Sequence, residues 1–182
     1  MELKEIIKNR RSIRKFDTKK IDNSIIEEIL YYGSLAPSGK NRQPWRFVVI
    51  QDDIELKNKI ADIMIEKSEE KINNGESAGS IEATARIMKE APVFVAVFNT
   101  WNGNVNSNLQ SIGACIENIS LAATDMGIGS LWIGDINCVH EEIENLIGKK
   151  EALLVAGISL GYPLENPNAR PRIAINELIE WR

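Results

Sequence analysis

Apolar residues along the chain follow two spacings, and the change from one to the other predicts a mixture of helices and strands. Apolar positions three or four residues apart mark helices, whereas short continuous runs of β-branched or aromatic residues mark buried strands. The spacing predicts helices that start at Leu3, Ser24, Ile54, Ser80, Ser107 and His140. The runs WRFVVI (45–50), VFVAVF (93–98), SLWIG (130–134) and ALLVAGISL (152–160) predict four strands.

Several residues indicate where the helices begin and end. Ser24, with Glu27 three residues later, forms a capping-box pattern, and the helix that it opens should end before Pro37. Ser107 is the predicted cap of the central helix, which has a broad apolar face and ends at Gly127. Helices and strands intermix too irregularly for a βαβ repeat, so the predicted fold class is α+β.

Length and composition suit one compact domain over residues 1–182. The chain has 182 residues, of which 43% are hydrophobic, enough to bury a core without disulfides or metal. It shows neither a signal peptide nor an apolar run of membrane-spanning length, so we expect a cytoplasmic protein. One histidine and two separate cysteines form no metal-ligand cluster and no disulfide framework.

The stretch GISLG, residues 157–161, matches the nucleophile-elbow pattern of hydrolases. That pattern requires the serine on a tight turn between a strand and a helix, with the histidine later in the chain. Here a proline-rich segment follows the serine, and the single histidine, His140, precedes it. The context therefore argues against a hydrolase.

Basic residues gather in two places, although the whole chain carries a net charge of −4. The first 20 residues hold eight Lys or Arg and three acids, and Arg10 and Arg14 are expected one turn apart on a helix end, with Ser12 between them. Near the other end, Pro171 separates Arg170 from Arg172 and should keep that backbone extended. Paired guanidinium groups suit a phosphate, whereas each pair alone could equally be a solvated surface.

The loop LAPSGKNRQPWRFVVI, residues 35–50, is unusually rich in hydrogen-bond donors for a segment that enters the core. Two prolines stiffen it and Gly39 allows a close approach of the backbone. Trp45 and Phe47 are expected to anchor the loop by packing in the core. Taken alone, the loop could also be an ordinary Pro-Gly connector.

Three separated motifs together resemble those of one family, the FMN-dependent nitroreductases. RRSIRKF is similar to the family's N-terminal phosphate motif, APSGKNRQPWRFVVI to its P-S-x-x-N-x-Q-P-W loop and strand, and ARPR to its C-terminal basic pair. The resemblance covers nearly the whole chain. It implies a nitroreductase-like fold, with a central, mostly antiparallel sheet flanked by helices, in an intertwined homodimer with two interfacial FMN sites.

The resemblance also implies which residues bind FMN. The phosphate and ribityl groups would be bound by Arg10, Arg11, Ser12, Arg14, Arg170 and Arg172. The edge of the flavin would be lined, from the partner subunit, by Pro37, Ser38, Gly39 and Asn41. Gly134 would lie beside the isoalloxazine ring, where the missing side chain allows the backbone to come close.

The implied activity is an oxidoreductase reaction in which FMN carries the chemistry and no catalytic side chain or metal is required. NADH or NADPH would reduce FMN, which would then pass electrons to a small nitroaromatic, quinone or related conjugated acceptor in a ping-pong sequence. Two other roles stay open. One is a flavin-binding protein of the same fold that acts as an enone reductase, a dehalogenase or in flavin supply, and the other is a nucleic-acid-binding module that uses the basic N-terminal segment. We expect that the protein binds neither nucleic acid nor membranes.

The chain departs from larger relatives in three respects. Ile133 stands where they carry a glutamate before the glycine, and no residue aligns with their flavin-contacting asparagine. The chain is also short between residues 75 and 107, where larger relatives carry helices that cover the substrate pocket. Either the stretch NTWNGNVN replaces that cover, with Trp101 as a stacking ring, or it is a mobile surface loop.

Overall fold

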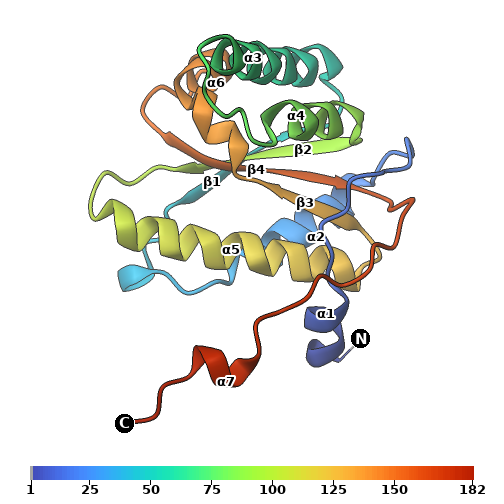
Figure 1. Ribbon diagram of the computed structural model, residues 1–182, viewed down its shortest axis with the longest axis vertical. Helices are drawn as coiled ribbons and strands as arrows, with labels where there is room; N and C mark the ends of the chain where they lie inside the picture. The colour runs from blue at the N-terminus through green and yellow to red at the C-terminus, as the bar shows by residue number, and fades with distance from the viewer. Residues whose placement is uncertain (1) are drawn as a thin grey trace.

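The computed structural model describes residues 2–182, in which four antiparallel strands form one sheet between two layers of helices (Figure 1). The strand order is β1-β2-β4-β3. The strands are β1 (Trp45–Ile50), β2 (Val93–Asn99), β3 (Gly129–Ile133) and β4 (Leu153–Gly161). The helices are α1 (Leu3–Asn9), α2 (Asn23–Ser34), α3 (Ile54–Asn73), α4 (Ile81–Glu90), α5 (Val105–Asp125), α6 (His140–Ile147) and α7 (Ile175–Leu178), with short 3-10 turns at Gly39–Asn41 and Asp135–Val139. The α+β prediction is confirmed.

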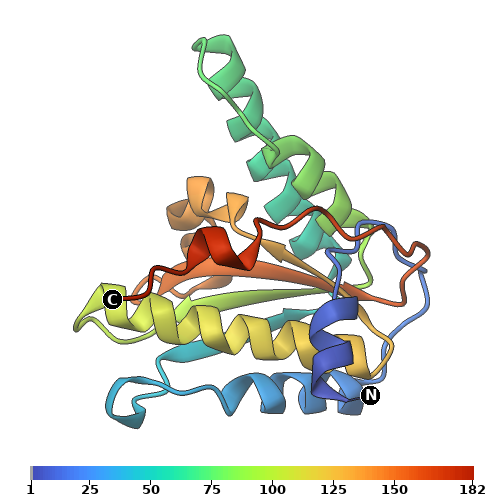
Figure 2. The same ribbon diagram turned by 60° about the horizontal axis from the view of Figure 1, so that its bottom comes forward.

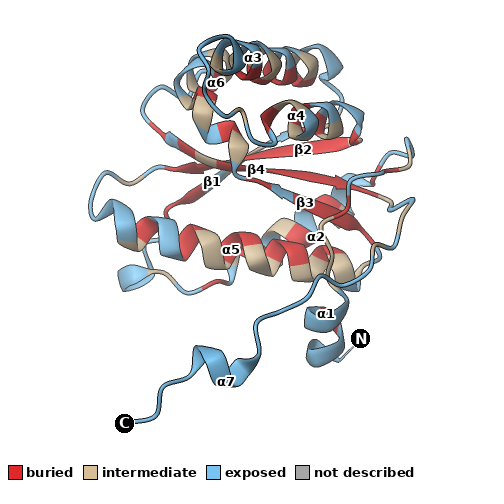
Figure 3. Ribbon diagram, viewed as in Figure 1, coloured by how far each residue is buried: buried red, intermediate tan, exposed pale blue. Residues whose placement is uncertain are grey.

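Strand β2 lies inside the sheet and is buried on both faces, which explains its unbroken apolar sequence (Figure 3). Val93, Val95 and Val97 pack with α2 and α5 on one face. Phe94 and Phe98 point to the other face, where α3, α4 and α6 cover the sheet. The two cores place the predicted central helix, α5, directly against the sheet.

Three of the predicted helix starts are wrong by one or two residues: α2 begins at Asn23 and not at Ser24, α4 at Ile81 and not at Ser80, and α5 at Val105 and not at Ser107. Helix α2 is preceded by Asp22 and not by Ser24, and no side chain caps it. Helix α5 begins earlier than predicted because the side chain of Asn104 caps it, accepting a hydrogen bond from the Ser107 backbone N–H at 3.1 Å. The predicted end of this helix is confirmed, since Gly127 follows it with a left-handed φ of 73°.

The GISLG stretch lies within β4, so its serine is not on a nucleophile elbow. The Ser159 side chain is fully buried, and Gly157 faces the ring of Phe94 across the β2–β4 pair. A Cβ at position 157 would lie 2.4 Å from a ring carbon of Phe94. Close packing against Phe94, and not a nucleophile elbow, explains the glycine at position 157.

We therefore expect Gly157→Ala to destabilise the fold by about 1–3 kcal/mol, because the added methyl group displaces the ring of Phe94 within a closely packed core. Urea unfolding monitored by far-UV circular dichroism measures the change. Gly134→Ala is the matched control, since a Cβ there meets no atom of the chain within 4 Å. Equal stability of the two variants would contradict this packing role.

Lys57 on α3 is a buried cation at only 5% relative exposure. Its Nζ donates a hydrogen bond to the backbone carbonyl of Ala91, at the end of α4. Burial lowers the pKa of the Lys57 ammonium below its usual 10.5. The folded protein therefore resists protonation at this position more than the unfolded chain does.

The lowered pKa predicts how the stability contribution of Lys57 changes with pH. Between the folded pKa and 10.5 the unfolded chain binds more protons, so the wild-type free energy of unfolding should rise with pH relative to Lys57→Met. Urea unfolding of both proteins at pH 7.5 and pH 10 gives the difference in free energy of unfolding between wild type and variant at each pH. The loss of the Ala91 hydrogen bond contributes equally at both pH values, so it cancels when the two differences are compared. A difference that stays constant, or that moves the other way, would contradict it.

Helices α3 and α4 form a hairpin that projects from the body of the molecule (Figure 2). The polar stretch of residues 74–80 separates the two helices. Nowhere in residues 2–182 is a helix both long enough and apolar enough to cross a membrane.

Candidate functional site

Segments near the two ends of the chain, within residues 7–14 and 167–172, meet around a basic cavity of about 530 Å³. Helix α1 ends at Asn9, and the following segment runs alongside β3, where Ser12 forms a bridge with Ser130. The cavity is lined by Ile7, Lys8, Arg10, Arg11, Ser12, Arg14, Pro167, Asn168, Ala169, Arg170 and Arg172. All six residues expected to bind a phosphate are thus brought together by the fold.

The expectation that Arg10 and Arg14 share one helix face is wrong. The backbone leaves the helical conformation at Arg10, and Arg14 lies beyond the bridge to β3. Other contacts orient the two side chains. Glu117 on α5 forms an ion pair with Arg10 at 3.3 Å, and the Arg14 guanidinium donates to the Ser12 carbonyl at 3.1 Å.

Arg11 connects the two walls of the cavity. Its guanidinium donates hydrogen bonds to the carbonyls of Lys8 at 2.6 Å, of Arg10 at 2.8 Å and of Pro167 at 3.2 Å. Glu165 adds a second link, because its carboxylate accepts the Arg14 backbone N–H at 2.6 Å. Arg11 therefore builds the cavity more than it offers free donors to a ligand.

The remaining guanidinium groups of the cavity keep their charge available. Within residues 2–182, Arg14, Arg170 and Arg172 form no ion pair with a carboxylate. Uncompensated guanidinium groups around one space favour an anion with several acceptor oxygens. The cavity can therefore hold a phosphate group.

A second cavity, of about 280 Å³, shares Arg14 with the first. Gly134 lies at its wall with ordinary backbone angles, φ −83° and ψ −28°, and a Cβ there would meet no atom of the chain within 4 Å. Neither backbone conformation nor internal packing requires glycine at this position. The missing side chain leaves space beside the backbone, as a flat ligand at this point would need.

The loop 37–43 lies at a third cavity, of about 300 Å³, which has no lining residue in common with the other two. Pro37, Ser38 and Gly39 line it together with residues of α5. Asn41 adopts a left-handed backbone with φ 54°, and Lys40 and Gln43 do the same. Three such non-glycine residues in four positions are costly and indicate a loop held in one shape.

Hydrogen bonds and a cation–π contact fix this loop to the segment after β2. Thr100 donates its backbone N–H at 2.9 Å and its hydroxyl at 3.1 Å to the Pro44 carbonyl. The guanidinium of Arg42 lies 3.9 Å from the centre of the Trp101 ring. Asn108 of α5 donates to the Trp101 carbonyl at 2.8 Å. One face of the Trp101 ring is thus covered by Arg42 of the same chain.

Trp45 is buried at 4% exposure, and Phe47 packs against the same core, so the anchoring prediction for these residues is confirmed. Sequence reasoning missed several polar residues of the site: Ser80, Thr84, Glu117, Asp135 and Glu165. Each acts across a distance of many residues in the chain, and no local motif marks any of them.

The thiols are not activated for nucleophilic chemistry. Burial raises the pKa of Cys115 to about 12, and burial together with the charge of Asp135 raises the pKa of Cys138. Within the part of the chain that the structure describes, no group of three or more His, Cys, Asp or Glu residues could hold a metal ion. The site offers cationic and backbone donors, a set that suits a bound cofactor.

Comparison with known sequences supports this interpretation. Residues 7–162 match the model of the nitroreductase family. A protein of Archaeoglobus fulgidus, provisionally named NADH dehydrogenase/NAD(P)H nitroreductase, is 33% identical over 87% of this chain and 84% of its own length. An iodotyrosine deiodinase of Thermotoga neapolitana is 28% identical over 97% of this chain and 95% of its own length.

Solved structures share the fold over the whole chain. A BluB-like flavoprotein of Clostridium difficile superposes with a TM-score of 0.85 and 29% identity, covering 100% of this chain and 99% of that protein. A protein of Desulfovibrio desulfuricans, provisionally named a nitroreductase and solved in complex with FMN, gives a TM-score of 0.81 and 25% identity, covering 100% and 98%.

Proposed function

The chain belongs to the nitroreductase family, and we propose that it is an FMN-dependent oxidoreductase that takes electrons from NADH or NADPH and delivers them to a small nitroaromatic, quinone or related conjugated acceptor. The observation that carries this proposal is the pair of cavities joined at Arg14: one is rich in unpaired guanidinium groups, and the other is flanked by the open backbone of Gly134. A phosphate and a flat ring are the two ends of FMN.

The basic cavity fits the phosphate end of FMN. Arg10, Arg14, Arg170 and Arg172 would bind the phosphate oxygens, with the Ser12 hydroxyl as a further donor. The ion pair with Glu117 holds Arg10 in place before any ligand binds. Charge-assisted hydrogen bonds of this kind contribute about 1.5–3 kcal/mol each.

The second cavity fits the ring end. Gly134 would lie beside the isoalloxazine ring, because its backbone can approach a flat surface that any larger residue would push away. When bound, FMN supplies hydride acceptance from a nicotinamide and electron donation to the second substrate. The chain's residues would hold the ring and keep one of its faces accessible.

We propose that the site is completed by a second copy of this chain. Loop 37–43 is held in a strained shape, yet its cavity has no lining residue in common with the Gly134 cavity. In a homodimer, Pro37, Ser38, Gly39 and Asn41 would line the flavin edge of the partner subunit. The rigid backbone of this loop supports that role, since strain of this kind accumulates at ligand sites.

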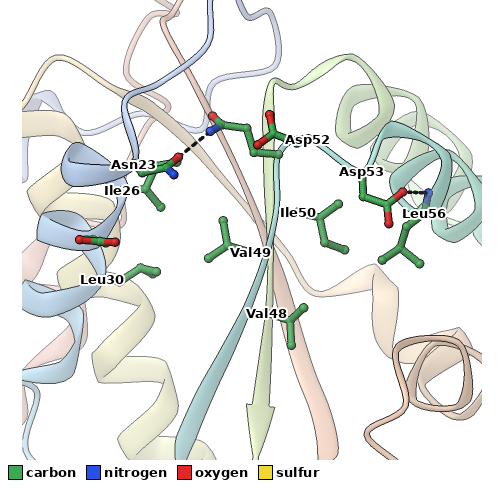
Figure 4. A pocket seen from close by; sticks show the side chains of 11 residues that line it. Asn23, Ile26, Leu30, Val48, Val49, Ile50, Asp52, Asp53 and Leu56 are labelled. Atoms are coloured by element: carbon green, nitrogen blue, oxygen red, sulfur yellow. Dashed lines mark hydrogen bonds between the residues drawn. The ribbon is translucent and has the colours of Figure 1, made fainter.

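The C-terminal segment supports the same dimer. Residues 173–182 are exposed and extend away from the body of the molecule, although they carry five large apolar side chains (Figure 1). Trp181 is 88% exposed. Beside the free edge of β1 lies a cavity of about 440 Å³ with apolar side chains such as Ile26, Leu30 and Val49 at its wall (Figure 4). The apolar arm of a partner subunit would cover such a surface.

Removal of the arm tests the proposed dimer. In analytical ultracentrifugation, a chain that ends at Arg172 should sediment as a monomer. It should bind FMN at least tenfold more weakly than the full chain, because one wall of each site is lost. Ile175→Ser with Trp181→Ser keeps the length of the arm and should act in the same direction. A truncated protein that stays dimeric would contradict the role of the arm.

Turnover assays test the proposed reaction. With NADH or NADPH as donor, initial rates against a nitroaromatic acceptor should give the parallel double-reciprocal lines of a ping-pong sequence. The deiodinase relative favours one second candidate, reductive removal of halide from a halogenated phenol. Release of iodide from iodotyrosine, with no turnover of nitroaromatics or quinones, would replace the first proposal with the second.

A further inference from the structure

Three polar side chains meet at the wall of the Gly134 cavity. The Asp135 carboxylate accepts a hydrogen bond from Ser80 Oγ at 2.6 Å and another from Thr84 Oγ1 at 3.0 Å, both on its Oδ2 atom. All three residues line the cavity together with Gly134 and Arg14. The cluster joins two segments that are far apart in the chain, the turn after β3 and the first turn of α4.

The hydroxyl groups of this cluster are not used for helix capping. Ser80 precedes α4 at the N-cap position, yet its side chain makes no capping hydrogen bond and donates to Asp135 instead. Thr84, one turn later, donates to the same oxygen. The Gly134 carbonyl is also engaged, because it accepts the backbone N–H of Asn137 at 3.1 Å. The turn that carries Gly134 is therefore fixed from both sides.

The carboxylate also brings a negative charge to this cavity. Among the described residues, Asp135 forms no ion pair with a lysine or arginine, and Arg14 is the only cationic residue that lines the same space. The apolar side chains of Leu131, Ile133 and Ile87 form much of the remaining wall. In such surroundings charges are less screened than in water.

On the premise that FMN binds as proposed above, we propose that Asp135 is a positioning residue of the redox site. It fixes the Gly134 turn against α4 through the two hydroxyl groups, and its charge lowers the reduction potential of the bound flavin. Two-electron reduction makes a flavin more negative, so a nearby carboxylate disfavours the reduced form. The bound flavin is thereby a stronger reductant toward its acceptor.

The potential of the bound flavin tests the effect of the charge. Asp135→Asn keeps an oxygen that accepts from Ser80 and Thr84, but it removes the charge. At a fixed solution potential, measured by equilibration with a reference dye, the ratio of reduced to oxidised flavin should rise about tenfold, a shift of about 30 mV for a two-electron couple. Glu82→Gln is the control, since it removes a charge from the same helix at a residue paired with Arg86.

A second variant separates the clamp from the charge. Ser80→Ala with Thr84→Val keeps the carboxylate and removes both donors, so FMN should bind about tenfold more weakly while thermal unfolding of the apoprotein changes little. Equal potentials for Asp135→Asn and Glu82→Gln would overturn the inference while wild-type FMN binding still supports the proposed function. Absence of FMN binding to the wild-type protein would overturn both.

Discussion

The double variant Arg10→Ala, Arg172→Ala should bind FMN about 10²- to 10⁴-fold more weakly than the wild-type protein. Each guanidinium lines the basic cavity from a different end of the chain, and each charge-assisted hydrogen bond to the phosphate contributes about 1.5–3 kcal/mol. Quenching of FMN fluorescence in a titration with apoprotein measures the dissociation constant. The purified double variant should also contain little flavin.

Riboflavin provides the decisive comparison for this variant, because it has the same ring and ribityl chain but no phosphate. The affinity for riboflavin should be nearly the same in the wild-type protein and the double variant. Lys20→Ala with Arg86→Ala is the control, since it removes two cations that pair with Asp52 and Glu82 outside the cavity. If riboflavin and FMN lost affinity equally, the arginines would act on the fold or the ring and not on the phosphate.

Gly134→Val should weaken the binding of FMN and riboflavin to the same extent, roughly 5- to 150-fold for about 1–3 kcal/mol of steric overlap. The isopropyl group would occupy the space beside the backbone in which the ring is proposed to lie. The same fluorescence titration measures both affinities. Because the two ligands differ only in the phosphate, this pattern distinguishes the ring end of the site from the arginine end.

The stability of Gly134→Val is its internal control. A Cβ at this position meets no atom of the chain within 4 Å and φ is −83°, so the apoprotein should unfold at nearly the wild-type temperature. A lower unfolding temperature together with weaker binding would indicate that Gly134 is required for the stability of the fold and not for binding of the ring. Unchanged affinity for both flavins would place the ring elsewhere.

The fold could be predicted from the sequence because local patterns agree with it. VFVAVF is apolar without interruption because β2 is buried on both faces, and Gly127 ends α5 because its left-handed backbone is accessible to glycine. The helix starts were less predictable. Asn104 and Ser107 are both good capping residues three positions apart, and the helix is capped by Asn104.

Only those residues of the candidate site that lie within recognisable sequence motifs could be predicted. The arginines near both ends of the chain are visible in the sequence, and the fold brings them around one cavity. Residues that orient them are not visible, because Glu117 and Glu165 reach the site from remote positions. Ser80 and Asp135 are 55 residues apart, and only the three-dimensional fold shows that they meet.

The central claim is that this chain binds FMN and that a nicotinamide reduces it there. The most direct measurement is the visible absorption spectrum of the protein, mixed with FMN and desalted, followed by anaerobic addition of NADH or NADPH in the same cuvette. We expect a protein-bound flavin band that one of the nucleotides bleaches. A colourless protein after desalting would contradict the cofactor assignment, and a bound flavin that neither nucleotide bleaches would contradict the proposed reaction.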